Sequence, residues 1–223
     1  MKKVILSLAI LSSLALTSCK KEANAPEAQT TEAADAKASS EAAAEYKVVT
    51  AKSVIDWAGT KPTGKHTGTI HLKSGEIFAN NNAVESGKFT IDMNSIVVTD
   101  LTEKDGKADL EGHLKGSAKE EEDHFFNVAK YPEAIFEITK VGAAVQGKSI
   151  IEGNLTMKGI TKNIKFPAMV SIDNAHIALV SDTFTINRTQ WGVNYASKSV
   201  FGDLGDKFVN DDIELKISVE AAK

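Results

Sequence analysis

The sequence predicts an all-β domain of antiparallel strands, and three observations support this fold class. From Tyr46 to the C-terminus, apolar and polar residues alternate with a period of two, as Ile213, Leu215, Ile217 and Val219 do near the end. Short groups of Gly, Asn, Asp and Pro separate the alternating stretches. Consecutive strands joined by short turns run antiparallel. Strict alternation gives each strand one apolar face and one solvent-facing side.

Eight strands are expected, and turn residues such as Asn80-Asn81-Asn82 and Asp173-Asn174 lie between them. The expected strands are, in chain order, Ser53–Lys61, His66–Gly75, Val84–Asn94, Glu133–Val141, Ser149–Met157, Asn163–Asp173, Ala175–Asn187 and Asp211–Glu220. One short helix is expected to begin at Glu120–Asp123, because a helix N-terminus favours acidic side chains, and to end before Pro132. Eight such strands can close as a barrel or stack as a sandwich, and alternation alone does not choose.

Residues 1–18 have the pattern of an export signal, with Lys2 and Lys3 before an apolar stretch too short to span a membrane. The motif Leu16-Thr17-Ser18-Cys19 then resembles the lipobox of bacterial lipoproteins, in which the cysteine thiol carries the lipid. That resemblance implies an extracytoplasmic protein anchored through Cys19, and Lys20 favours the outer membrane. An ordinary cleaved signal with a chance cysteine is the alternative.

Residues 19–45 are expected to be the lipidated cysteine and a disordered tether. Residues 20–45 hold ten alanines, and no large apolar residue appears before Tyr46. Such a segment buries too little apolar surface to offset the entropy of ordering it. The remaining residues, 46–223, are expected to form one domain.

Composition and motifs exclude several functions. The formal charge of −4 and the pI near 5.8 disfavour nucleic acid as a partner. The single cysteine excludes an internal disulfide, and no nucleophile elbow, phosphate-binding loop or HExxH motif occurs. The five histidines are expected to be solvated or singly hydrogen-bonded, with no metal site, although His113 and His124 could meet through the fold. We therefore expect neither catalytic residues nor a cofactor.

Arg188 shares the strand face of Phe184 and Ile186, which is the apolar one. A guanidinium there needs polar partners, either a structural ion pair or a ligand headgroup. The glycine-punctuated segment after it, from Gly192 to Gly205, is expected to be a long loop over one end of the β structure, either gating a ligand or plugging the core.

Several motifs together resemble the YceI-like family of periplasmic lipid-binding proteins. They are GKHTGTIHLKSGEI (Gly64–Ile77), GKFTIDMNSI (Gly87–Ile96), LEGHLKG (Leu110–Gly116), DHFFNVAKYPEAIFEITKV (Asp123–Val141), EGNLTMKGITKNIKFP (Glu152–Pro167) and INRTQWGVNY (Ile186–Tyr195). The chain departs from many members by its lipobox and alanine-rich segment. It also has Asp-His before Phe125-Phe126, where many members have a single Asp.

The resemblance implies a lipocalin-like antiparallel eight-stranded β-barrel with one short crossover helix. It also implies non-enzymatic binding of an isoprenoid lipid, a quinone or a polyprenyl chain, in an apolar channel. His66 or Arg188 would meet a headgroup, and the expected channel residues are Trp57, Phe89, Ile91, Met93, Phe136, Ile138, Leu155, Met157, Phe166, Phe184 and Ile186. The alternatives are an interaction module with a packed barrel and no cargo, and an enzyme on the same scaffold.

Overall fold

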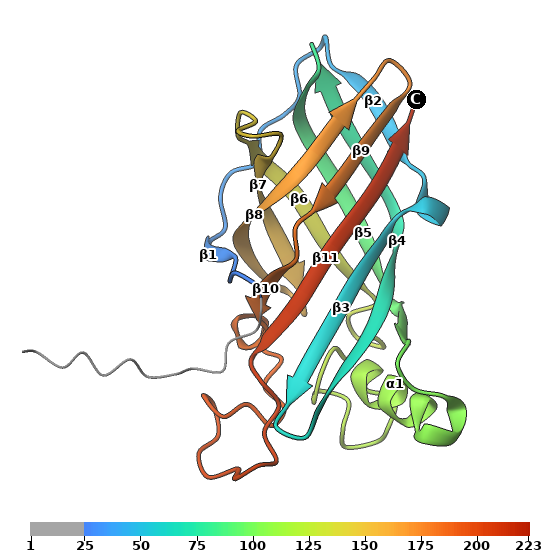
Figure 1. The fold of residues 1–223 in the computed structure, drawn as a ribbon, viewed down its shortest axis with the longest axis vertical. Helices are drawn as coiled ribbons and strands as arrows, with labels where there is room; N and C mark the ends of the chain where they lie inside the picture. Colours follow the sequence, from blue (N-terminus) through green and yellow to red (C-terminus); the bar gives the residue numbers. More distant parts are fainter. Residues whose placement is uncertain (1–24) are drawn as a thin grey trace, which may run out of the picture.

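The computed structural model describes residues 25–223, and eight of its strands form a closed antiparallel ring. Each strand pairs with its neighbour in chain order from β3 (Val54–Lys61) to β9 (His176–Ser181), and the last strand, β11 (Asp212–Ala222), pairs with both β9 and β3. The barrel expected from the family resemblance is therefore confirmed. Figure 1 shows the ring as a tall, tilted cylinder with α1 beside its lower end and the C-terminus at its upper end.

The ring contains all eight strands that the alternation predicted. They are β3 (Val54–Lys61), β4 (Gly64–Asn80), β5 (Ala83–Val98), β6 (Glu133–Val141), β7 (Ser149–Met157), β8 (Ile160–Ile172), β9 (His176–Ser181) and β11 (Asp212–Ala222). The expected strand over 175–187 is split in two. The first part, β9, stops pairing with β8 at Ser181, and the second part, β10 (Phe184–Asn187), pairs with β11.

Tight hairpins set the order of the ring. Asn81 and Asn82 connect β4 to β5, and both have positive φ, 51° and 60°. Lys158 and Gly159 connect β7 to β8 with φ of 49° and 77°. Two consecutive positive φ values are the mark of a type I′ turn, whose twist matches that of the flanking strands. Asn and Gly occupy three of these four positions, as that backbone requires.

The predicted helix over 120–131 is wrong in position. The α-helix α1 spans Lys107–Lys115, between glycines 106 and 116 in the left-handed conformation, and residues 120–131 form turns. Glu120 and Asn127 have φ of 73° and 46°, which no α-helix accommodates. Leu110 and Leu114, four residues apart on one face of α1, pack on the core instead. None of the helices in the described range 25–223 is long and apolar enough to cross a membrane.

Part of the N-terminal segment differs from the expected tether. β1 (Gln29–Glu32) pairs with β8, and Ala28 is buried. β2 (Ala44–Val48) then adds to β4 and β11. Backbone pairing, rather than apolar side chains, holds this alanine-rich stretch, which explains why composition predicted disorder. The predicted signal, residues 1–18, and Cys19 lie outside the described residues.

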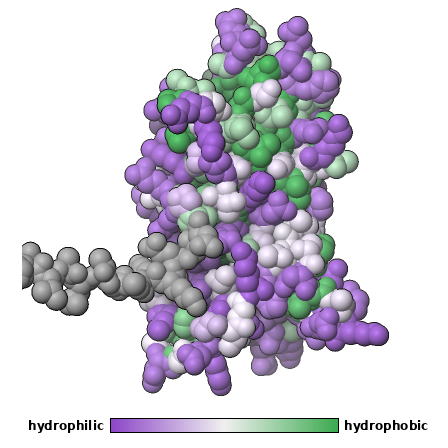
Figure 2. Space-filling view, in the orientation of Figure 1, coloured by the Kyte–Doolittle hydropathy of each residue, from purple (hydrophilic) through white to green (hydrophobic). Residues whose placement is uncertain are grey.

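Four phenylalanines cross the interior of the ring as a continuous layer, here called the phenylalanine layer. Ring centroids are 6.3 Å apart for Phe89–Phe136, 5.8 Å for Phe136–Phe166 and 4.5 Å for Phe166–Phe184. The Phe136 ring packs on Gly153 of the neighbouring strand, whose missing side chain leaves room for it. Outside, hydrophilic side chains cover most of the face in Figure 2, and hydrophobic ones gather mainly in its upper half.

We expect Gly153→Ala to lower the free energy of unfolding by about 1–3 kcal/mol, because overpacking strains a filled core. Its Cβ would lie 2.4 Å from Phe136 Cζ and 2.7 Å from the Glu137 carbonyl oxygen. Gly59→Ala is the matched control, since a Cβ there meets nothing within 4 Å, and it should change stability by less than about 0.5 kcal/mol. Urea unfolding measures both, and equal effects would contradict the close approach.

Candidate ligand-binding pocket

A pocket of about 350 Å³ occupies the end of the ring beside α1. Its interior wall is apolar and comes from six ring strands, β10 and α1. These wall residues include Ile55, Trp57, Ile70, Ile91, Met93, Ile96, Leu110, Leu114, Ala134, Leu155, Met157, Ile186, Ile213 and Leu215. Pockets of roughly 300–1,000 Å³ with mostly apolar walls are typical small-molecule sites.

Eight of the thirteen residues expected to contact a ligand line this pocket: Trp57, His66, Ile91, Met93, Leu155, Met157, Ile186 and Arg188. The other five are Phe89, Phe136, Ile138, Phe166 and Phe184. All five are buried, and the four phenylalanines among them form the phenylalanine layer. These five residues belong to the buried core and do not line the pocket.

The mouth of the pocket carries the polar groups. Lys61 and Lys207 are exposed lining residues, and neither ammonium has an ion-pair partner within residues 25–223. His66 Nδ1 lies 2.9 Å from Asp100 Oδ2, and the Thr67 backbone N–H donates to the other carboxylate oxygen at 2.8 Å. Asp100 thereby orients the imidazole at the rim. The pocket thus has an apolar interior and a mouth with two free positive charges.

Arg188 binds the loop that covers the pocket. Its side chain is 1% exposed, and its guanidinium donates to four backbone carbonyls. The acceptors are Val193 at 2.6 Å, Tyr195 at 2.9 Å, and Val209 and Asn210 at 3.0 Å each. Burial lowers the pKa of Arg188, and Asp211, 3.8 Å away, opposes that shift. The guanidinium therefore joins both ends of the loop.

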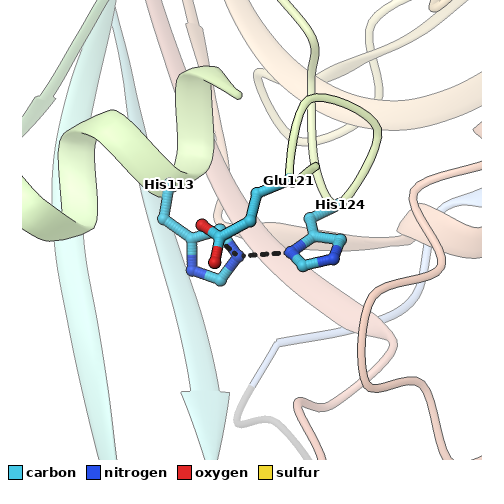
Figure 3. Close-up of side chains that lie close together, drawn as sticks. All are labelled: His113, Glu121 and His124. Atoms are coloured by element: carbon cyan, nitrogen blue, oxygen red, sulfur yellow. Dashed lines mark hydrogen bonds and ion pairs between the residues drawn. The ribbon is translucent and has the colours of Figure 1, made fainter. Parts of the chain in front are cut away.

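Two histidines meet an acid at the rim, which sequence spacing did not predict (Figure 3). His113 Nε2 on α1 lies 2.9 Å from His124 Nδ1 and 3.9 Å from Glu121 Oε2. Tyr195 packs on both imidazoles, with centroids at 4.7 Å and 4.4 Å. Burial lowers the pKa of His113, Glu121 partly offsets this, and His124 adds to it.

Several lining residues come from outside the regular strands and were not among those expected from the sequence. Phe125, Phe126 and Tyr195 reach the pocket from loops, where no periodicity assigns a face. Leu110 and Leu114 did carry a usable signal, because their four-residue spacing is that of one helical face.

We expect Arg188→Lys to lower the free energy of unfolding by about 3 kcal/mol, because one ammonium cannot satisfy four divergent carbonyls. Amide hydrogen exchange should accelerate across residues 193–210 and stay unchanged in β5. Lys198→Ala, which removes an exposed cation from the same loop, is the control. Unchanged protection of the loop in Arg188→Lys would show that the guanidinium does not hold it.

Known proteins of the same shape provide an independent comparison. A crystal structure of BcnA from Burkholderia cenocepacia superposes with a TM-score of 0.58 at 21% identity, covering 78% of this chain and 99% of that one. A polyisoprenoid binding domain from Saccharophagus degradans, described as implicated in plant cell wall breakdown, gives 0.55 at 13% identity, covering 79% and 97%. At such identities these matches show the fold.

Sequence relatives point the same way. A UPF0312 protein of Yersinia pestis is 36% identical over 86 residues, which is 35% of this chain and 41% of the relative. The aligned segment therefore spans less than half the length of this relative. The model of the YceI-like domain matches residues 46–221, most of the chain. The chain belongs to the YceI-like domain family.

Proposed function

We propose that the protein binds an isoprenoid-type lipid, a quinone or a polyprenyl chain, and stores or transports it without transforming it. The observation that carries the proposal is the apolar pocket at the end of the ring beside α1. An interaction module with a packed barrel would not need such a cavity. The polyisoprenoid binding domain from Saccharophagus degradans, which shares the fold, adds support.

The size of the pocket sets how much of a lipid it encloses. A volume of about 350 Å³ lies toward the lower end of the roughly 300–1,000 Å³ of typical small-molecule pockets. A pocket of this size would enclose the first isoprene units of a long chain, or a quinone ring with the start of its tail. Each enclosed unit of five carbons contributes roughly 4 kcal/mol of hydrophobic free energy before the losses on binding. The part of a longer tail that the pocket does not enclose would remain outside.

The distribution of charge gives the ligand an orientation. The tail would lie against Ile91, Met93 and Leu155, and the headgroup would remain at the mouth beside Lys61 and Lys207. Two cations without partners in the described part of the chain favour an anionic or strongly polar headgroup.

We expect Gly59→Leu to reduce lipid binding about 100-fold. Gly59 lines the pocket with free space at its Cβ, and four added carbons exclude about 3 kcal/mol of ligand burial. Gly64→Leu is the matched control, because a Cβ at this exposed glycine also meets nothing.

The measurement is mass spectrometry of lipid that co-purifies with the chain from Lys20 onward, exported behind an unrelated cleavable signal and isolated without detergent. Isoprenoid should accompany the parent chain and Gly64→Leu, and should be depleted from Gly59→Leu. Absence of lipid from the parent chain, or equal amounts in the two leucine variants, would overturn the assignment.

We further propose that Cys19 anchors the protein to the outer membrane of a bacterium, facing the periplasm or the cell surface. The basis is the lipobox Leu16-Thr17-Ser18-Cys19 and the Lys20 that follows it. In bacterial lipoproteins the N-terminal cysteine carries three acyl chains, more than the two hydrophobic signals that stable anchoring needs.

We expect Cys19→Ser to abolish incorporation of labelled palmitate, because Cys19 is the only thiol of the chain. Ser13→Ala, a change within the same export segment, should leave labelling unchanged. Labelling in live cells followed by membrane fractionation checks both. Palmitate on Cys19→Ser, or a parent chain without label, would contradict the anchor.

A further inference from the structure

The cluster of His113, Glu121 and His124 is a second site, distinct from the apolar wall of the pocket. One ligand atom from each side chain lies within 4.8 Å of the others. Two imidazoles and a carboxylate with one open position form a donor set that zinc uses in proteins. From these observations, we propose that His113, Glu121 and His124 bind one Zn²⁺ ion at the rim of the pocket.

The distances suit a tetrahedral ion. Ligand atoms about 2.0–2.1 Å from zinc stand roughly 3.3 Å apart in a tetrahedron. His113 Nε2 lies 2.9 Å from His124 Nδ1 and 3.9 Å from Glu121 Oε2. The histidines need to separate by a few tenths of an ångström, and the half-exposed Glu121 needs to swing inward. The two facing nitrogens now share one proton, and each ring can carry its proton on its other nitrogen when a metal binds.

The backbone around the cluster is fixed, so the ligands are pre-positioned. Gly116, with φ of 72°, ends α1 and reverses the chain, and the Phe126 N–H donates to the Leu114 carbonyl at 3.1 Å. From the opposite side, Lys158 Nζ donates to the carbonyls of Phe125 at 2.7 Å and Asp123 at 3.2 Å. The loop that carries Glu121 and His124 is thereby held over the last turn of α1 (Figure 3).

Aromatic packing fixes the imidazoles as well. His113 packs edge-on against Phe125 at 5.0 Å and against Tyr195 at 4.7 Å. Tyr195 lies on the loop whose backbone Arg188 binds. Rings held by packing keep the geometry that a metal site requires. The three ligands come from one short segment and leave the fourth coordination position to water. The proposed zinc site does not depend on whether the pocket binds a lipid.

The test is isothermal titration of the full chain with Zn²⁺, in a Cys19→Ser background that removes the one thiolate. We expect one equivalent to bind. His113→Ala, His124→Ala and Glu121→Gln should each weaken binding by more than about 100-fold, beyond the loss typical of an outer-shell partner. His176→Ala is the matched control, because this exposed histidine on β9 lies outside the cluster, and it should leave the affinity unchanged.

Two further measurements make the result decisive. Co²⁺ bound in place of Zn²⁺ should give the intense visible absorption of a four-coordinate ion, and the weak absorption of an octahedral ion would overturn the tetrahedral assignment. Circular dichroism checks that each variant folds. Glu121→Gln replaces a half-exposed loop side chain, so it tests the site even if a histidine variant unfolds. Absence of saturable binding, or equal binding by Glu121→Gln and the parent, would overturn the proposal.

Discussion

The pairing between β3 and β11 closes the ring, and the interior depends on that closure. Val54–Gly59 lies in register against Ile213–Ser218, which joins the first ring strand to the last. A closed antiparallel ring leaves none of its eight strands as an edge, and it turns one face of every strand toward a common interior. Whether that interior is solid or hollow then depends on the side chains at each height. Here the phenylalanine layer fills one height, and mostly aliphatic side chains toward the end of the ring beside α1 line the pocket.

Arg188 couples the fold to the site at the end of the ring. The strand β10 ends directly before it, and the covering loop wraps around its guanidinium, so Tyr195 is held where it packs on His113 and His124. A single buried cation therefore positions both the cover of the pocket and the wall of the histidine cluster. Main-chain carbonyls suit this purpose, because their positions do not depend on which side chains the loop carries.

Alternation in the sequence was enough to locate the ring strands, because the side of the sheet to which each side chain points is set locally along a strand. It could not separate Ile91, which lines the pocket, from Phe89, which is buried in the phenylalanine layer. Both share one parity, and two residues differ by roughly 7 Å in height along a strand. Height relative to the cavity depends on register across the whole ring. His113 meets His124 because the chain reverses direction at Gly116. The sequence did not reveal this reversal, because the acidic residues at 120–123 instead indicated the start of a helix.

The N-terminal segment pairs with the barrel, and this pairing shortens the free chain between a membrane anchor at Cys19 and the folded domain. The Pro26 carbonyl accepts from the Thr185 N–H at 3.0 Å, three residues before Arg188 at the mouth end. Seven residues from Cys19 to Pro26 reach at most about 25 Å, whereas an unpaired chain up to Tyr46 would reach roughly four times as far. If Cys19 is the anchor, the mouth of the pocket would therefore stay within less than one bilayer thickness of the membrane that holds the protein. A water-insoluble ligand would then be exchanged with that one membrane and would not be carried from one membrane to another.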